Sequence, residues 1–300
     1  ATCIETVPMI RTQLNLFGND KYDAIDNATD EHFWAYHAGM ADGDGCIRCR
    51  EDRKNAIEIT LELIDKNVIE ELSNLYGVKL SVRDPKKSKR KDRFLIKRRK
   101  SYYVNLCSDN AIHYLKRIHP YMIEKRRVVE KIAKIRNFEL NKMKPHQGAM
   151  FYWLAGYFDA EGCIIFNHKQ YFKHSNRYGT TVSLKWSTTN HTVARYVKRL
   201  LNRWFRSKPN QTVASIHKTV KHGNKKSVYQ VVIGQAIKVF IFARVFKDII
   251  KIKRKQDKFL KLIDYGNFCA QHKFKFGSVN FAKDSKRRGR WLEGIKSEME

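Results

Sequence analysis

Two copies of one short sequence, 117 positions apart, constrain the fold of this chain more than any other feature. Residues 38–47 and 155–164 are identical at six of ten positions, and two further positions exchange similar residues. Each copy follows a run of apolar and aromatic residues, and apolar and polar residues begin to alternate after each one. Self-similarity of this kind predicts a fold assembled from two related halves.

Each copy is expected to form a helix with a face of small residues. Small residues four positions apart lie on the same side of a helix, and two such faces allow helix backbones to approach closely. The two helices are therefore expected to pack against each other. The residues assigned to this interface are Ala38, Gly39, Gly43, Ala155, Gly156 and Ala160.

Each helix is also expected to end at a carboxylate. Gly45 and Gly162 follow the last expected turn, where a left-handed cap prefers glycine. Asp44 and Glu161 would then lie at the carboxyl ends of the helices, where the macrodipole already carries negative partial charge. A carboxylate is disfavoured there unless a cation is present. If the helices pack side by side, both acids meet at one site that suits a divalent metal with oxygen ligands.

This motif pair resembles the signature of the LAGLIDADG homing endonucleases, in the form that carries two motifs in one chain. The matching segments are residues 38–45 and 154–162, and His37 stands where the first motif usually begins with Leu, at a position that packs rather than reacts. The resemblance implies an α+β fold of two α-β-β-α-β-β-α domains, packed through the motif helices, with antiparallel sheets forming a saddle over DNA. A helix pair that serves only as a domain interface is the alternative, and the two retained acids weigh against it.

The charge of the chain indicates a polyanionic partner. Sixty Lys and Arg against thirty Asp and Glu give a net charge of +30, an excess typical of proteins that bind nucleic acid or an anionic membrane. No apolar run of about eighteen residues is present, so no spanning helix is expected and nucleic acid is the favoured partner. The resemblance implies that this nucleic acid is double-stranded DNA. The six cysteines suggest no disulfide framework, and the CxxC at Cys46 and Cys49 lacks a second pair that would complete a zinc site.

Hydrophobic periodicity predicts the same order of elements in both halves. The expected domains are residues 30–138 and 150–265, with an N-terminal arm at 1–29, a linker at 139–149 and a basic tail at 266–300. In the first domain we expect a helix from Asp30, strands after Gly45 and over 57–63, a helix over 65–76 stopped by Gly77, strands over 78–83 and 102–107, and helices over 110–119 and 121–138. In the second we expect strands over 163–169 and 180–187, a helix over 190–205, strands over 212–218 and 228–233, and helices over 235–246 and 247–263.

Alternate strand residues are candidates for reading DNA, because a sheet face fits the major groove. The apolar residues of 57–63 belong against the helices, which leaves their polar neighbours on the opposite face. The candidates are Glu58, Thr60, Glu62 and Tyr102 in the first half and Thr181, Ser183, Lys185 and Gln230 in the second. The two glutamates either accept from cytosine N4 or pair with nearby Lys or Arg, and both interpretations stay open. The basic run at 83–100 is expected to contact phosphates.

The resemblance further implies how phosphodiester cleavage would occur. Asp44 and Glu161 would each bind metal together with the carbonyl of the preceding residue, Gly43 or Ala160. Mg²⁺ or Mn²⁺ would support cleavage, and Ca²⁺ would support binding alone. A lysine near each acid would organise the attacking water or the charge on the phosphate, and aligned helix starts assign Lys125 and Lys253 to this role. The alternative is that both are ordinary phosphate-contacting lysines.

The sequence therefore predicts a monomeric homing endonuclease that breaks both strands of a long DNA target. The halves differ at the reading positions, so an asymmetric target is expected, and the resemblance implies short 3′ overhangs. The chain lacks the ends of an intact intein, which favours an intron-encoded enzyme of a mitochondrion or chloroplast. Two other classes stay open, namely a maturase that binds its host intron RNA on the same fold, and a DNA-binding protein without catalysis.

Overall fold

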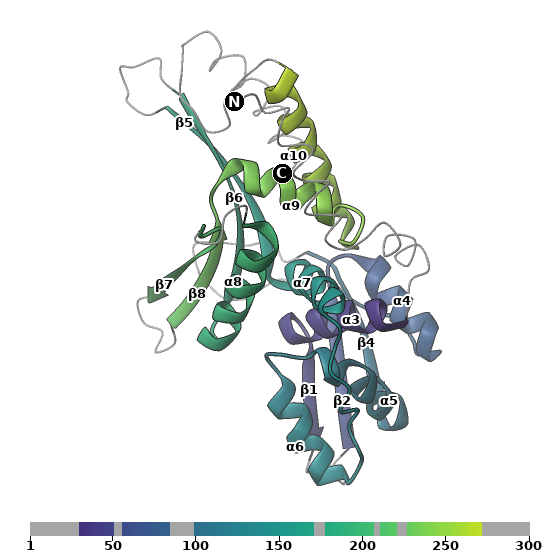
Figure 1. Cartoon of the computed structure of the whole chain (residues 1–300). Coiled ribbons are helices and arrows are strands. Elements are labelled where there is room, and N and C mark those ends of the chain that lie inside the picture. The colour runs from purple at the N-terminus through teal and green to yellow at the C-terminus, as the bar shows by residue number, and fades with distance from the viewer. Residues whose placement is uncertain are drawn as a thin grey trace. The chain divides into compact units, whose positions relative to one another are not determined.

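The computed structural model describes residues 30–50, 56–84, 99–170, 178–206, 211–220 and 227–271. These residues form two four-stranded antiparallel sheets accompanied by helices, so the predicted α+β class is confirmed (Figure 1). The chain packs as two compact units. The first unit comprises Asp30–Ala160 and Lys251–Arg254, and the second comprises the described parts of Glu161–Ile250 and Lys255–Glu300. Among the described residues, no helix is long and apolar enough to cross a membrane.

The first unit contains one sheet with the strand order β1-β2-β4-β3, and helices α4, α5 and α6 pack on it. Helix α7 is part of this unit except for its last residue. The elements are α3 (Asp30–Gly43), β1 (Cys46–Arg50), β2 (Ala56–Leu63), α4 (Lys66–Tyr76), β3 (Ser81–Arg83), β4 (Ser101–Cys107), α5 (Ser108–Ile118), the 3₁₀ turn η2 (His119–Tyr121), α6 (Arg126–Arg136) and α7 (Gln147–Glu161).

The second unit repeats this plan with the strand order β5-β6-β8-β7. An aromatic cluster fills its core, in which Trp186 meets the edge of Phe242 and Phe242 stacks on Phe246. The elements are β5 (Gly162–Gln170), β6 (Tyr178–Thr188), α8 (His191–Phe205), β7 (Ser215–Val220), β8 (Ser227–Ile233), α9 (Ala236–Phe246) and α10 (Lys253–Gln271). The predicted α-β-β-α-β-β-α order is therefore confirmed in both halves.

Strand β2 shows why the alternation in the sequence predicts the buried face correctly. Ile57, Ile59, Leu61 and Leu63 are buried, whereas the residues between them are only half-buried. Successive side chains of a strand point to opposite faces, so the apolar set packs under the helices. Glu58, Thr60 and Glu62 consequently share the outer face of the sheet, as predicted.

The ends of several helices also follow local sequence. Helix α4 stops at Gly77, which has a left-handed backbone with φ of 58°. Asn190 caps α8, because its side-chain oxygen accepts from the backbone N–H groups of Thr192 and Val193. Gly45 differs from the prediction, since its backbone is not left-handed. Its lack of a side chain is needed because a Cβ would lie 2.6 Å from the carbonyl oxygen of Ala41.

Three helices have boundaries that differ from those predicted. Helix α6 begins at Arg126 rather than 121, and α10 begins at Lys253 rather than 247 and continues to Gln271. Helix α7 begins at Gln147, inside the predicted linker. The N-terminal arm, the tip of the basic run at 85–98 and the tail beyond 271 lie outside the described residues.

Candidate functional site

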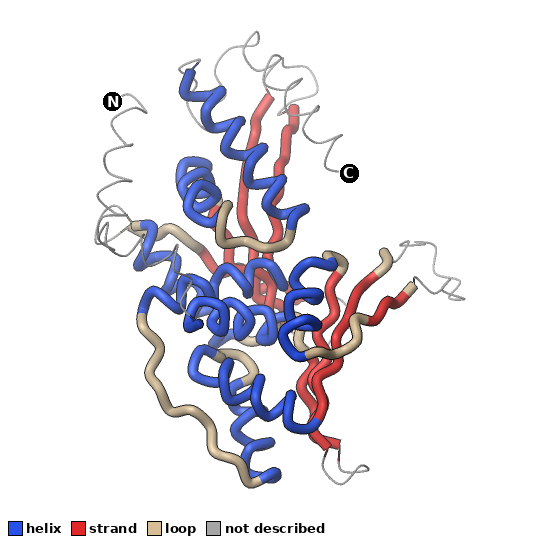
Figure 2. The backbone as a smooth tube through the Cα atoms, turned by 90° about the vertical axis from the view of Figure 1, so that its right-hand side faces the viewer, coloured by secondary structure: helices blue, strands red, loops and turns tan. Residues whose placement is uncertain are grey.

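The motif helices α3 and α7 lie side by side in the first unit (Figures 1 and 2). An added Cβ at Gly39 would lie 2.1 Å from the carbonyl oxygen of Trp153, and one at Gly156 would lie 2.0 Å from that of Tyr36. Such separations exclude any side chain, so the backbones of the two helices are in contact. Ala38 and Ala155 are fully buried. The predicted close packing of the motif helices is therefore confirmed at both glycines.

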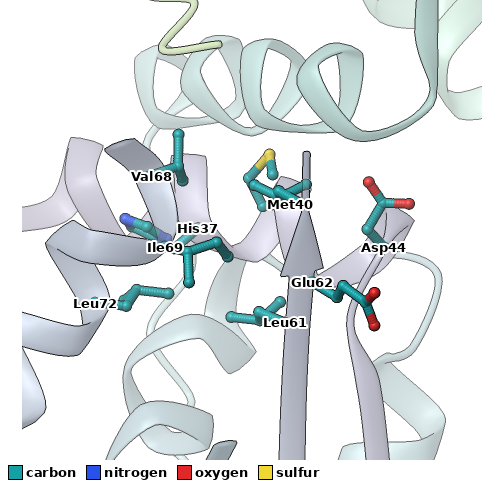
Figure 3. A pocket seen from close by; sticks show the side chains of 9 residues that line it. His37, Met40, Asp44, Leu61, Glu62, Val68, Ile69 and Leu72 are labelled. Carbon is teal, nitrogen blue, oxygen red and sulfur yellow. The ribbon is translucent and has the colours of Figure 1, made fainter. Parts of the chain in front are cut away.

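Asp44 follows the last residue of α3, and its backbone N–H donates to the carbonyl of Met40 at 2.9 Å. The residue is exposed and stands at the carboxyl end of the helix. Its side chain lies at the rim of a small cavity between α3, β2 and α4, with the carboxylate of Glu62 nearby (Figure 3). The rest of the lining is mainly apolar and comprises His37, Met40, Leu61, Leu63, Val68, Ile69 and Leu72.

Lys125 brings a positive charge to the same helix end. Its ammonium group donates to the carbonyl oxygens of Ala41, Gly43 and Gly45 at 2.7, 3.0 and 2.6 Å. These carbonyls include unsatisfied acceptors at the end of α3, where cations are favoured. The structure thus places the predicted lysine next to the carbonyl that precedes Asp44, although 81 residues (125 − 44) separate the lysine from the acid.

The donor set at this end of α3 fits a hard divalent cation. The available ligands are a carboxylate and a backbone carbonyl, both of them oxygen donors of the kind that Mg²⁺ and Ca²⁺ prefer. A carbonyl oxygen has two lone pairs, so the bond from Lys125 leaves Gly43 able to accept a second partner. Within the described residues, no three His, Cys, Asp or Glu side chains form a metal cluster of their own. Asp44 and the Gly43 carbonyl are therefore oxygen donors of the kind that such an ion prefers.

Asp42 and Asp159, two residues before the motif acids, are both 1% exposed. Burial raises the pKa of Asp42, and the backbone N–H groups of Ile123 and Lys125 and the indole of Trp153 oppose that rise. Asp159 accepts from the backbone N–H groups of Lys251 and Ile252. Both aspartates thus bind the backbone of the segments that lead into α6 and α10.

The second motif acid, Glu161, is the half-buried last residue of α7. Burial raises the pKa of the Cys163 thiol two residues later, and the ammonium groups of Lys255, Lys185 and Lys258 oppose that rise. Lys255 is only 6% exposed, whereas the predicted Lys253 is exposed. Cys163 occupies the position in the second motif that Cys46 occupies in the first, and Cys46 directly follows the Gly45 carbonyl bound by Lys125. Lys255 is therefore a further candidate for the counterpart of Lys125, and the role assigned to Lys253 stays a prediction.

On the outer face of the first sheet, the predicted reading residues have protein partners. Glu58 accepts from the guanidinium of Arg50 at 2.8 Å, and Glu62 accepts from Arg83 and from the hydroxyl of Ser101. Thr60 donates to the amide oxygen of Asn105 at 2.7 Å. Of the two interpretations left open, the structure therefore supports ion pairs with neighbouring arginines.

The prediction for Tyr102 is wrong, because this residue lies opposite Leu63 on the helix-covered face of the sheet. Tyr103 lies opposite Glu62 and so shares the outer face, where the guanidinium of Arg83 is 5.0 Å from the centre of its ring. A shift of one residue in strand register exchanges the two faces. The local alternation already indicates this face, because buried Val104 and Leu106 share the side of Tyr102 and alternate with exposed Asn105 and Cys107.

In the second sheet, all four predicted reading residues lie on the outer face. Thr181, Ser183 and Lys185 alternate with the buried residues Val182, Leu184 and Trp186. Gln230 lies opposite Ser187 on the neighbouring strand, which places it on the same face as Lys185. This face differs from that of the first sheet, since no carboxylate occurs at these four positions.

No protein-family profile matches the chain, and no curated protein matches it. Several solved structures match the fold of the chain. The meganuclease I-AabMI, bound to uncleaved DNA, has a TM-score of 0.55 and 14% identity, over 87% of this chain and 98% of that one. The homing endonuclease I-LtrWI, bound to target DNA, has a TM-score of 0.52 and 11% identity, over 81% and 92%. I-SmaMI, bound to an uncleaved DNA target in the presence of calcium ions, has a TM-score of 0.50 and 12% identity, over 80% and 92%.

These neighbours match the fold of this chain over most of its length, and the two packed motif helices of this chain carry the two motif sequences. The chain therefore has the fold of the LAGLIDADG homing endonucleases.

Proposed function

We propose that this protein is a metal-dependent homing endonuclease that acts as a single chain on a long DNA target. The observation that carries the proposal is the carboxyl end of α3, where exposed Asp44 lies next to a carbonyl bound by Lys125. An acid and an ammonium group at one helix end are the elements needed to handle a phosphate and a nucleophilic water. Neighbours with the same fold, I-AabMI and I-LtrWI, are described as bound to DNA.

DNA would lie against the outer faces of the two sheets. The net charge of +30 supplies the attraction to phosphates, and polar side chains on alternate strand positions would contact base edges in the major groove. The outer face of the first sheet carries two arginine–glutamate pairs, whereas the predicted positions of the second carry Thr, Ser, Lys and Gln. A protein with two such different faces is suited to an asymmetric target.

Asp44 with the Gly43 carbonyl, and Glu161 with the Ala160 carbonyl, would hold divalent metal. A bound Mg²⁺ or Mn²⁺ supplies acidification of water and neutralises charge on the leaving oxygen. The ammonium groups of Lys125 and Lys255 would orient the attacking water or stabilise charge on the phosphate. By the same resemblance, cleavage would leave short 3′ overhangs, and the protein would be an intron-encoded monomer of a mitochondrion or chloroplast.

The test is cleavage of a randomised duplex library in Mg²⁺, with parallel reactions in Ca²⁺ and with Asp44→Asn and Glu161→Gln. We expect the wild type to select one long motif, each variant to lose most cleavage while keeping its melting temperature, and Ca²⁺ to support binding alone. Binding to a folded intron RNA without any DNA cleavage would refute the proposal in favour of a maturase. Salt-dependent DNA binding without cleavage in any metal would identify a non-catalytic DNA-binding protein.

A further inference from the structure

Two buried aspartates occupy matching positions in the motif helices, and their contacts cross between those helices. Asp42 in α3 and Asp159 in α7 each stand two residues before a motif acid. A carboxylate that is removed from water needs several hydrogen-bond donors to offset the free-energy cost of its burial. Each carboxylate receives two backbone N–H groups from the segment that leads into α6 or α10, and one side-chain donor from the other motif helix.

Asp42 receives hydrogen bonds from its own half and from the other motif helix. The backbone N–H groups of Ile123 and Lys125 donate to its two oxygens at 2.7 and 2.8 Å. The indole N–H of Trp153, in α7, donates to it at 2.9 Å. The first two bonds fix the backbone of Lys125, whose ammonium group contacts the end of α3.

Asp159 repeats this arrangement with the two helices exchanged. The backbone N–H groups of Lys251 and Ile252 donate to one carboxylate oxygen at 2.8 and 3.2 Å. The hydroxyl of Tyr36, in α3, donates to the same oxygen. These bonds fix the start of α10, the helix that carries Lys253 and Lys255. Burial and the neighbouring carboxylate of Asp159 raise the pKa of Tyr36 well above its ordinary value, so its hydroxyl keeps the proton it donates.

We infer that Tyr36 and Trp153 are positioning residues that act crosswise. Each lies in the motif helix of one half and holds the lysine-bearing segment of the other half. Tyr36 in the first motif helix would support the segment that leads into α10, and Trp153 in the second would support Lys125. This inference rests on the proposed endonuclease function. Loss of either donor is therefore expected to slow cleavage of one DNA strand more than cleavage of the other.

The first experiment compares Tyr36→Phe and Trp153→Phe on a target duplex labelled separately on each strand, at saturating protein. We expect each variant to slow one strand about tenfold, the effect of losing roughly one hydrogen bond to a charged group, and the two variants to slow opposite strands. Nicked intermediates of opposite polarity would then accumulate. Tyr76→Phe is the control, because that hydroxyl bonds to His113 and to neither aspartate nor either lysine-bearing segment.

A second measurement does not depend on cleavage. Hydrogen exchange should increase at the Lys251 and Ile252 amides in Tyr36→Phe, and at the Ile123 and Lys125 amides in Trp153→Phe, with the other segment unchanged. If Trp153→Phe does not fold, Asp42→Asn takes its place. Equal slowing of both strands, or increased exchange in the wrong segment, would overturn the inference. If the wild type never cleaves DNA but each variant still increases hydrogen exchange only in its expected segment, the proposed function is refuted and the crosswise hydrogen bonds stand.

Discussion

The ammonium group of Lys125 lies 3.0 Å from the carbonyl oxygen of Gly43, the residue that precedes the exposed acid Asp44. One positive charge is thereby held where the dipole of α3 and a carboxylate both concentrate negative charge. The same lysine contacts two further carbonyls at this helix end. Lys125 is therefore held beside the first motif acid, its catalytic role stays a prediction, and the corresponding residue of the second half can be tested directly.

Lys255→Met is expected to reduce cleavage of one strand far more than Lys253→Met does. Lys255 is buried and influences the Cys163 thiol, just after the second motif, whereas Lys253 is exposed. A loss of about a hundredfold is expected for Lys255→Met, the lower end of the range for a positioned proton-transfer group. Strand-resolved cleavage rates at saturating DNA are the measurement. A larger loss in Lys253→Met would restore the original assignment.

Gly39→Ala should unfold or strongly destabilise the helix pair. The added Cβ would lie 2.1 Å from the backbone oxygen of Trp153, and a backbone contact cannot be relieved by a change of rotamer. We expect a loss of about 3 kcal/mol in the free energy of unfolding, at the upper end for overpacking, measured by denaturant titration. Gly234→Ala is the control, because nothing lies within 4 Å of a Cβ there. Equal stability of the two variants would contradict the close contact of the helices.

Glu71→Gln should remove part of the acid sensitivity of the fold. Burial alone would raise the pKa of Glu71, but hydrogen bonds from His37 and Lys251, together with the charge of Lys251, hold it at about 2 rather than 4.5. Lys251 Nζ lies 2.8 and 2.7 Å from its two oxygens, and Nε2 of buried His37 lies 3.4 Å away. A carboxyl with a lowered folded pKa stabilises the fold above its unfolded pKa and loses that contribution as pH falls through the folded value.

The stability difference between wild type and Glu71→Gln should therefore be full above pH 4.5 and vanish near pH 2. We expect about 1 kcal/mol at neutral pH, because the side chain is 37% exposed and solvent screens the ion pair. Thermal unfolding across this pH range measures it. Glu70→Gln, which removes only the surface pair with Lys66, is the control and should show little change. A constant difference at all pH values would exclude the ionised form of Glu71 as the cause.

Glu62→Gln should broaden the target sequence rather than abolish binding. Glu62 and the ring of Tyr103 hold the guanidinium of Arg83 on the outer face of the first sheet. An acid beside a phosphate would be repelled, so this arginine is placed to contact a base edge, where a guanidinium recognises guanine. Discrimination at one target position should fall by about tenfold, as expected for losing ~1.4 kcal/mol of base recognition. Sequencing of bound library members measures this, and an unchanged profile would exclude the role.

Local sequence determined much of this protein. The repeated motif predicted two related halves and the contact of their small-residue faces. The period of two in β2 predicted which residues face outward, and Gly77 and Asn190 marked helix ends, because backbone conformation and capping depend on a few neighbouring residues. Each of these features is encoded within about ten residues of the chain, so periodicity and capping rules can detect it.

Tertiary structure alone decided the starts of α6 and α10 and the environment of Lys255. Asp42 bonds to backbone N–H groups of residues 123 and 125, and Asp159 to those of 251 and 252, which fixes where the lysine-bearing segments meet the motif helices. These outcomes depend on hydrogen bonds between residues distant in the sequence, and such partners leave no periodic signal in the segments that they join.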